Sequence, residues 1–469
     1  MDNSTLLTRR AIGCSGDGIG RERRHLNGWD LHSAHIRRPL RFCHVATFYP
    51  PFSFGGDAIF LHRLVNALAK RGHEVDVIHC ADSFHALHPQ APTKEFPNCP
   101  NVTVHTLRSR AGLLSPLIAQ QSGRTWPKTQ EIRKLLSSKN FDVIHYHNIS
   151  LLGPEVLRLE PDCRDFLKVY TMHEHWLVCP MHILWKHNER LCEKPQCFSC
   201  ALKFRRPPQW WRYTKLLNNC SDSVDMFFSP SRFSRDMHHQ RGFVREIEHL
   251  PHFVPSSDDS PHDFDVSPHS RPYFLFVGRL EKIKGLQTVI PVFRDYPHAD
   301  LLVAGEGEYE AELRRQAGSL KNVVFLGLRQ QLELRRYYRH AIAVVVPSLC
   351  YEVFGNIIVE AYRERTPVIV QNLGGLQELV EESEGGFAYR TSDELLDAMQ
   401  RLRTDHELRC ALGERGYKKY LECWSEDVHL DAYLQLLARA AGRKFGCVPW
   451  ERCDRPSPEP SAARRDEPA

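Results

Sequence analysis

Long apolar segments are absent from this sequence of 469 residues. No run of about eighteen apolar residues occurs, so we expect no membrane-spanning helix. The first forty residues contain arginine clusters such as TRR and RERRH, but they lack the apolar core of a secretory signal. From these two absences we expect a cytoplasmic protein.

A strong charge of either sign is also absent, because the formal net charge is only +5. Such a small surplus does not indicate nucleic-acid binding, and no RNA- or DNA-binding motif accompanies it. It is compatible with an acidic ligand. Fifteen cysteines are many, but a chain without a secretory signal is not expected to form a disulfide framework. Most of these thiols should therefore be buried.

Strand and helix patterns alternate along most of the chain. Apolar runs suited to buried strands include RFCHVAT (41–47), EVDVIHC (74–80), FDVIHYH (141–147) and FLKVYTMH (166–173). Residues 57–72 have apolar positions at helical spacing and end on Gly72, a typical helix stop. This alternation predicts a parallel sheet covered by helices.

The alternation stops at a linker rich in Ser, Asp, Pro and His (254–272) and then starts again with YFLFVGR. We therefore expect two α/β domains whose strand ends face each other across a cleft. The predicted segments are a basic tail (1–39), an N-terminal domain (40–255) with a Cys-rich insertion (176–204), a linker (256–271), a C-terminal domain (272–425), a final helix (426–444) and a second tail (445–469).

Candidate ligand-binding residues follow the predicted strands. Gly55 and Gly56 precede a helix whose N-terminus can receive an anion, although a lone Gly-Gly is more often a simple turn. Arg279 and Lys284 follow the first strand of the second domain and suit a diphosphate, although basic loop residues are usually just solvated. His173 ends a strand, but a single histidine is more often structural.

One further segment is more specific. Glu352 and Glu360 bracket the turn in YEVFGNIIVEAY, which follows the strand-like AIAVVVPS. Together with FYPPFSFGGDAIF, FVGRLEKIKG and LLVAGEGEYE, this segment resembles the retaining glycosyltransferases of family 4, which have the GT-B fold. The resemblance covers roughly residues 40–440 with the motifs in the same order. It implies two Rossmann-like, doubly wound domains, with the final helix crossing back onto the first.

The resemblance also implies roles for the segment around the two glutamates. Glu352 would contact hydroxyls of the donor sugar, and Glu360 would accept both ribose hydroxyls of the nucleotide. The backbone amides of Phe354, Gly355 and Asn356 would approach the sugar and the phosphate between them.

The remaining implied contacts surround the leaving group. Arg279 and Lys284 would neutralise the diphosphate, and the amide of Gly56, next to Gly55, would face it. His173 would lie near the reacting sugar carbon. No acid catalyst or bound metal is needed for such a leaving group, and no Asp-x-Asp follows a predicted strand. We therefore expect no cofactor for catalysis.

The expected activity is transfer of a sugar from a UDP-, GDP- or ADP-sugar to a hydroxyl of a glycan or lipid-linked saccharide, with retention. Two alternatives remain from the sequence. One is another enzyme on the same architecture, such as a sugar-nucleotide epimerase or a phosphorylase, although no pyridoxal-lysine motif is visible for the latter. The other is a catalytically silent protein that binds a sugar nucleotide.

The Cys-rich insertion contains Cys179, Cys192, Cys197 and Cys200, spaced C-x12-C-x4-C-x2-C. This pattern is compatible with a tetrahedral structural zinc site, and the alternative is a set of packed thiols.

The next segment, KFRRPPQWWRYTKLL, mixes cations with aromatic residues: Arg205, Arg206, Trp210, Trp211, Arg212 and Lys215. It indicates either a peripheral contact with anionic lipid or an ordinary helix with buried tryptophans.

Overall fold

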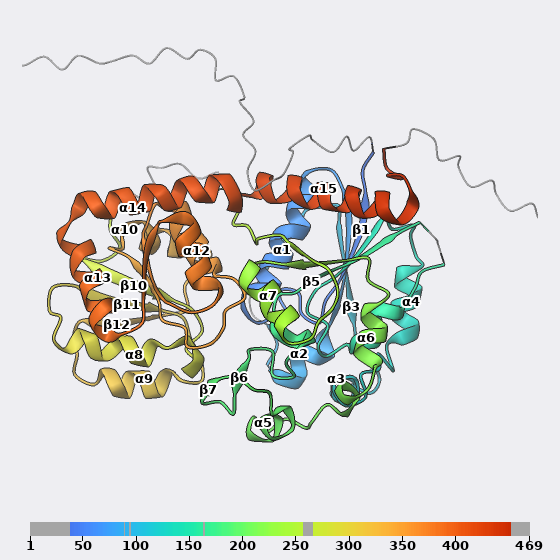
Figure 1. The fold of residues 1–469 in the computed structure, drawn as a ribbon, viewed down its shortest axis with the longest axis horizontal. Helices are drawn as coiled ribbons and strands as arrows, with labels where there is room; N and C mark the ends of the chain where they lie inside the picture. The colour runs from blue at the N-terminus through green and yellow to red at the C-terminus, as the bar shows by residue number, and fades with distance from the viewer. Residues whose placement is uncertain (1–37, 89, 93–94, 163–164, 257–265, 452–469) are drawn as a thin grey trace, which may run out of the picture.

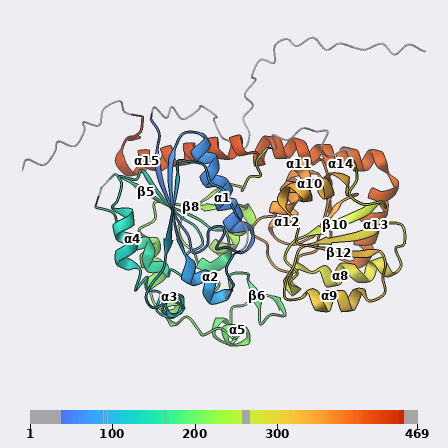
Figure 2. The same ribbon diagram turned by 180° about the vertical axis from the view of Figure 1, so that it is seen from behind.

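The computed structural model describes residues 38–88, 90–92, 95–162, 165–256 and 266–451. These residues form two α/β domains that lie side by side (Figures 1 and 2). Most of the two expected tails and of the expected linker at 256–271 lies outside the described residues.

The N-terminal domain is built on a seven-stranded sheet in the order β3-β2-β1-β4-β5-β8-β9, and all neighbouring strands are parallel. Its strands are β1 (Arg41–Val45), β2 (Glu74–Cys80), β3 (Val102–Leu107), β4 (Val143–Tyr146), β5 (Leu167–Thr171), β8 (Met226–Ser229) and β9 (Ile247–His249). A separate antiparallel hairpin joins β6 (Trp185–Lys186) to β7 (Arg190–Leu191).

The C-terminal domain is built on a six-stranded parallel sheet in the order β12-β11-β10-β13-β14-β15. Its strands are β10 (Tyr273–Val277), β11 (Asp300–Ala304), β12 (Val323–Gly327), β13 (Val344–Val346), β14 (Val368–Gln371) and β15 (Gly386–Tyr389). This is the doubly wound strand order of Rossmann-like folds, in which ligands bind where the order reverses, here between β10 and β13. In the N-terminal sheet the reversal lies between β1 and β4.

Helices connect and cover the strands of both sheets. Those of the N-terminal domain are α1 (Gly55–Lys70), α2 (Ala81–Leu87), α3 (Leu114–Ser122), α4 (Thr129–Leu136), η1 (Pro154–Arg158), η2 (His175–Leu177), α5 (Cys197–Lys203), η3 (Trp210–Tyr213), α6 (Leu216–Ser221) and α7 (Arg232–Gln240). Those that follow are η5 (Lys282–Lys284), α8 (Leu286–Val289), η6 (Ile290–Arg294), α9 (Glu310–Ala317), α10 (Gln331–His340), α11 (Asn356–Arg363), α12 (Gly375–Ser383), α13 (Ser392–Thr404), α14 (His406–Lys419), η7 (Tyr420–Trp424) and α15 (Glu426–Phe445). No described helix combines the length and apolar character needed to cross a membrane.

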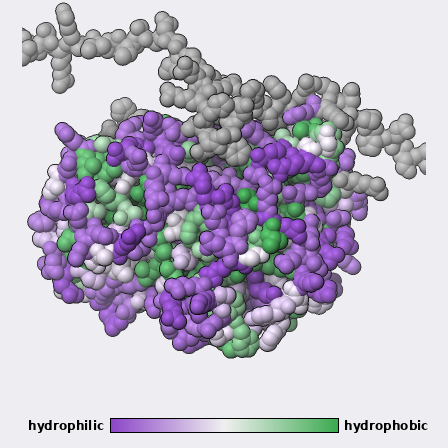
Figure 3. Space-filling model, in the orientation of Figure 1, coloured by the Kyte–Doolittle hydropathy of each residue, from purple (hydrophilic) through white to green (hydrophobic). Residues whose placement is uncertain are grey.

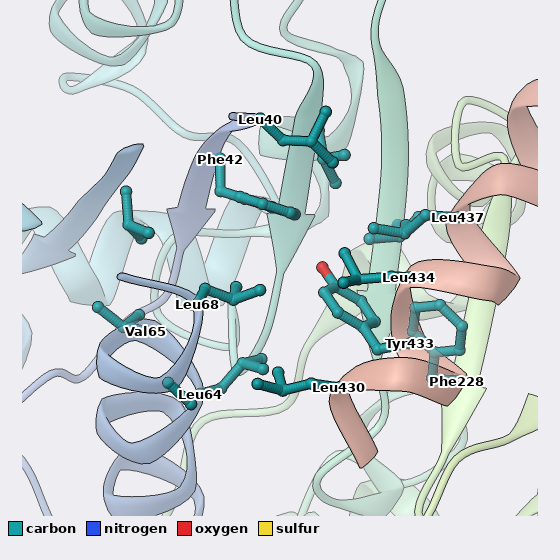
Figure 4. Close-up of a cluster of buried hydrophobic side chains, with 14 of the residues drawn as sticks. Leu40, Phe42, Leu64, Val65, Leu68, Phe228, Leu430, Tyr433, Leu434 and Leu437 are labelled. Carbon is teal, nitrogen blue, oxygen red and sulfur yellow. The ribbon is translucent and has the colours of Figure 1, made fainter. Parts of the chain in front are cut away.

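The last helix, α15, belongs to the N-terminal domain by its packing. Its side chains Leu430, Tyr433, Leu434 and Leu437 join a buried cluster with α1 and β1 (Figure 4). Salt bridges at its two ends reinforce the contact, from Arg71 to Asp427 and Asp431 and from Lys444 to Asp225. Together α14 and α15 form a band along one edge of both domains (Figure 1).

The chain passes between the domains twice, and the two passages touch. The amide of Val254 donates to the carbonyl of Trp424 at 3.0 Å, and the Tyr420 hydroxyl donates to the carbonyl of Val254 at 3.2 Å. Trp424 is fully buried and stacks on Tyr362 of α11. The outgoing and returning segments are therefore fixed to one another and to the C-terminal domain.

The expected doubly wound α/β architecture is confirmed. The apolar runs around 41–47, 74–80, 141–147 and 166–173 each contain a strand of the N-terminal sheet. Three strands of this sheet were not predicted from the sequence: β3, half of whose residues are exposed at the sheet edge, and the short strands β8 and β9.

Candidate active site

Glu352 and Lys284 form an ion pair in the loops that follow β13 and β10. The Glu352 carboxylate accepts hydrogen bonds from Lys284 Nζ at 2.6 Å and from Ser348 Oγ at 2.8 Å. Burial acts to raise the pKa of Glu352, but Lys284, Ser348 and Arg279 outweigh it, so the pKa lies below its usual value. Both predicted residues therefore carry their charges at the strand-end edge of the C-terminal sheet.

Gly285 allows this approach of the two loops. Its backbone has φ +75°, and a Cβ there would lie 1.8 Å from the carbonyl oxygen of Pro347. The neighbouring Ile283 carbonyl accepts from the amide of Leu349 at 2.8 Å. A residue with a side chain at position 285 would separate the loops that carry Lys284 and Glu352.

The predicted turn lies at the start of α11, facing the N-terminal domain. Phe354 and Gly355 are buried, and a Cβ on Gly355 would lie 2.8 Å from Ile358 Cδ1. Asn356 is the first residue of the helix, and a Cβ on Gly56 would lie 3.0 Å from its Nδ2. The starts of α1 and α11 therefore face each other, and their free amides provide two partial positive charges at one place.

Glu360 lies one turn further along α11 and links the domains. Its Oε1 accepts from Arg63 of α1 at 2.6 Å, and its Oε2 accepts from the Tyr338 hydroxyl at 3.0 Å. The side chains of Arg63 and Glu360 are only 8% and 15% exposed, so water screens this pair weakly. Any diol bound by Glu360 would replace one or both of these partners.

Arg279 is the most exposed of the predicted cations. Its guanidinium lies 2.6 Å from Glu281 Oε1, with 53% of the side chain exposed. It nevertheless contributes to lowering the pKa of Glu352. Arg279 thus acts on the same region as Lys284 while remaining free to reorient toward a ligand.

His173 is part of a hydrogen-bonded row of histidines. Its Nε2 lies 2.8 Å from His147 Nδ1, and its Nδ1 lies 3.1 Å from His252 Nε2. The row continues from His147 Nε2 to His44 Nδ1 at 3.0 Å, and from His252 Nδ1 to Asn356 Oδ1 at 3.3 Å. Burial lowers the pKa of His173 to about 3, so the ring is neutral at physiological pH.

The other end of this row includes the most compact group of potential metal ligands in the described residues. His44, His145 and His147 have ligand atoms within 4.8 Å of one another, and all three are buried. His145 already pairs with the hydroxyls of Tyr433 and Thr171, each at 2.8 Å, and His44 pairs with His147. Since most of these ring nitrogens are already hydrogen-bonded, the group forms a structural network.

A carboxyl group that was not predicted lies beside the paired glycines. Asp57 lies in the first turn of α1, and Asn148 donates to it at 3.3 Å. Burial, helped by Glu174, raises the pKa of Asp57 to about 6, while Asn148 and Arg279 act in the opposite direction. An acidic residue directly after Gly55-Gly56 was a usable signal. Arg63 and His252 were missed because no local pattern marks either residue as part of a site.

The four cysteines of the insertion lie in a different place from these residues. Cys179, Cys192 and Cys200 belong to a small buried cluster of their own, and all four line one pocket beside the β6–β7 hairpin. None of the described cysteines forms a disulfide.

The aromatic and basic segment divides into a buried part and an exposed part. Trp211 is buried, and the Arg212 guanidinium lies 5.1 Å and 4.7 Å from the rings of Trp176 and Trp211. Trp210 is 61% exposed. Arg205, Arg206 and Lys215 are also exposed.

Comparison with known proteins places the chain in a family. Residues 54–258 match the model of Glycosyltransferase Family 4, and residues 259–419 match that of Glycosyl transferases group 1. An uncharacterized glycosyltransferase, MJ1607 of Methanocaldococcus jannaschii, is 26% identical over 83% of this chain and 95% of its own length. The lipopolysaccharide core biosynthesis glycosyltransferase LpsE of Rhizobium meliloti is 30% identical over 42% of this chain and 59% of its own.

Solved structures agree on the architecture. Sucrose-phosphate synthase of Thermosynechococcus elongatus superposes with a TM-score of 0.64 at 21% identity, covering 85% of this chain and 100% of that one. HepE of Anabaena, solved with UDP and glucose, gives a TM-score of 0.59 at 18% identity, with coverage of 85% and 100%. The two facing Rossmann-like domains therefore have the GT-B fold. The chain belongs to the group 1, family 4 glycosyltransferases.

Proposed function

We propose that this protein transfers a hexosyl group from a nucleoside diphosphate sugar, with UDP as the first candidate carrier, to a hydroxyl acceptor with retention of configuration. The observation that carries the proposal is the convergence of Glu352, Lys284, Asn356 and Glu360 opposite Gly56, where two helix starts meet. Anabaena HepE, which shares the fold, has been solved with UDP-glucose, which supports UDP as the carrier.

The chemistry follows from the charges at this place. The helix starts and the cations Arg279 and Lys284 would stabilise the negative charge that develops on the diphosphate as the bond to the sugar breaks. Glu352 would hold the sugar hydroxyls and Glu360 the ribose diol. His173 would lie near the reacting carbon of the sugar, and its low pKa prevents the ring from taking up a second proton at neutral pH.

We propose a glycan or a lipid-linked saccharide as the acceptor. LpsE and the O-antigen chain mannosyltransferase C of Escherichia coli are named for steps in cell-surface polysaccharide synthesis. Such acceptors are often held at a membrane, so a surface that contacts lipid would support this choice.

An exposed apolar surface on the N-terminal domain is suited to that contact. It consists of side chains from α3, α5 and η3 and the residue before α3: Leu113, Leu114, Leu117, Phe198, Leu202, Trp210 and Tyr213. The rings of Phe198 and Trp210 are 5.5 Å apart. Apolar surface is visible at the lower edge of the molecule, around α5 (Figure 3). Exposed Lys203, Arg205, Arg206 and Lys215 accompany it, the composition that binds an anionic membrane surface.

A thermal-shift panel of UDP, GDP and ADP with their sugar conjugates tests the donor proposal, because a ligand of the native state raises the melting temperature. We expect a clear rise with one nucleotide, UDP first, followed by acceptor-dependent release of that nucleotide. A rise without any turnover would favour a silent sugar-nucleotide-binding protein. No rise with any nucleotide would contradict the proposed donor site.

Co-sedimentation with vesicles tests the membrane contact separately. We expect binding to vesicles that contain anionic phospholipid and none to neutral phosphatidylcholine vesicles. A Leu202→Ser, Trp210→Ser double variant should lose this binding while keeping the nucleotide-induced thermal shift. Equal sedimentation of the double variant and the wild type would refute the assignment of this surface.

A further inference from the structure

Residues 179–204 form a small unit with very little apolar core of its own. The unit contains the β6–β7 hairpin and the seven-residue helix α5. Its buried cluster consists of only six residues, and three of these are cysteines: Cys179, Met181, Leu184, Cys192, Cys200 and Ala201. A unit with so small a core usually needs a covalent or metal cross-link to hold one conformation.

The backbone of this unit also adopts costly conformations. Seven described non-glycine residues have positive φ, and five of them lie between positions 182 and 205. Four of these, His182, Leu184, His187 and Asn188, belong to the unit, and the fifth, Arg205, follows it directly. Such conformations persist only where surrounding interactions hold them in place.

The four thiols converge on one pocket at the centre of the unit. Cys179 follows η2, Cys192 follows β7, and Cys197 and Cys200 lie on the first turn of α5. Together they line the same small pocket. Cysteines three residues apart at a helix start, facing two further cysteines from loops, are a common ligand arrangement for zinc.

Backbone amides already point at these sulfur atoms. The amide of His187 donates to Cys200 Sγ at 3.3 Å, and the amides of Leu184 and Met181 hydrogen-bond to Cys179. Amide donors stabilise a thiolate far more than a protonated thiol, which is itself a weak acceptor.

Two arginines place positive charge beside the four cysteines. Arg241 NH1 lies 4.0 Å from Cys192 Sγ, and its NH2 donates to the Cys192 carbonyl. Arg212, whose guanidinium lies against the rings of Trp176 and Trp211, lines a neighbouring pocket together with Arg241 and Cys197. A zinc ion with four thiolates carries a net charge of about −2, and two guanidinium groups balance it.

We propose that Cys179, Cys192, Cys197 and Cys200 bind one zinc ion that stabilises this unit. On binding, each thiol releases its proton and forms one sulfur–zinc bond, so no coordination position remains for catalysis. Among the described side chains, no three of these sulfur atoms lie mutually within 4.8 Å. The edge of a tetrahedral zinc–sulfur site is about 3.8 Å, so the thiols turn inward around the pocket when the ion binds.

Metal content of the full-length protein, purified without chelator, tests the proposal directly. We expect about one zinc per chain by mass spectrometry, and loss of this zinc in a Cys197→Ser, Cys200→Ser double variant. A Cys410→Ser, Cys447→Ser double variant, altered at cysteines outside the cluster, should keep it. Retention of the nucleotide-induced thermal shift shows that the first double variant still folds.

A second measurement uses only the wild-type chain. Removal of the metal with a chelator should expose four additional thiols to an alkylating reagent, and mass spectrometry should locate them at the four named positions. Cobalt(II) added to the metal-free protein should produce the intense absorption of tetrahedral thiolate coordination. Zinc below about 0.2 per chain, with no change in thiol reactivity, would overturn the proposal. Iron with acid-labile sulfide would overturn it in favour of an iron–sulfur cluster.

Discussion

Replacement of Glu352 by glutamine should separate donor binding from transfer. In the described structure the Glu352 carboxylate holds Lys284 Nζ at 2.6 Å, and the two side chains are 20% and 22% exposed. A diphosphate that recruits Lys284 must first break this pair. After allowance for solvent screening, a pair of this exposure is worth about 1 kcal/mol. Its removal should therefore tighten UDP binding about fivefold, because about 1.4 kcal/mol corresponds to tenfold.

The rate of sugar transfer should fall in the same variant, although UDP binds more tightly. If Glu352 holds the sugar hydroxyls, loss of its charge should lower turnover by about 100-fold or more, as expected for a charge-assisted contact to the reacting group. Isothermal titration with UDP and an assay of UDP release would measure the two effects. Glu414→Gln is a matched control, because Glu414 pairs with Arg365 on the exposed face of α14. A parallel loss of UDP affinity and turnover in Glu352→Gln would refute the reasoning, since Glu352 would then support Lys284 rather than compete for it.

Three further changes test other parts of the structure. UDP binding should weaken about fivefold as the pH rises through about 6, because Asp57 is then ionised and its charge repels the diphosphate. In calorimetry, Asp57→Asn should show a smaller change with pH, because only the titration of UDP itself remains. An identical pH dependence in the variant and the wild type would contradict the role of Asp57. Glu360→Gln should weaken UDP binding about tenfold, because the ribose loses its hydrogen bonds to a charged group. Arg63→Met, which frees Glu360 from its ion pair, should not weaken UDP binding. Equal losses of UDP affinity in the two variants would argue that the pair is purely structural. Leu437→Ala should lower the free energy of unfolding, measured in urea, by about 2–5 kcal/mol, since this side chain is fully buried between α15 and the sheet. A loss below about 1 kcal/mol would show that the contact is dispensable.

The fold was predictable because a strand buried within a parallel sheet consists of a short run of apolar residues. The runs that became β1, β2, β4 and β5 could be read one by one, since every residue needed for the inference is local. The edge strand β3 could not, because its exposed side chains remove the apolar run that marks a buried strand. Burial alone was not enough, since β8 is fully buried but its apolar run, MFF, is too short to stand out.

The site was predictable only in part, for a related reason. Glu352, Lys284 and Glu360 were found because each lies in a local motif. The partners of Glu360 were not found, because contacts such as that of Arg63 with Glu360 join residues 297 positions apart. Asp57 shows the same limit, since its raised pKa depends on burial and on Glu174, neither of which leaves a local pattern.

The histidine row illustrates this limit on a larger scale. His44, His147, His173 and His252 come from separate segments and touch only after the N-terminal sheet has formed. In the sequence each is one of 26 histidines. Only the strand-end position distinguished His173, and no feature of its neighbours indicated that both of its ring nitrogens are engaged.

The two adjacent chain passages at Val254 and Trp424 determine how the domains can move. Because they are hydrogen-bonded to each other, any rotation of one domain against the other would bend both passages at the same place, which would make them a single hinge. Displacement then grows with distance from the hinge. A change at Trp424 should therefore alter the rates of donor entry and product release while leaving the bond-breaking step itself unaffected.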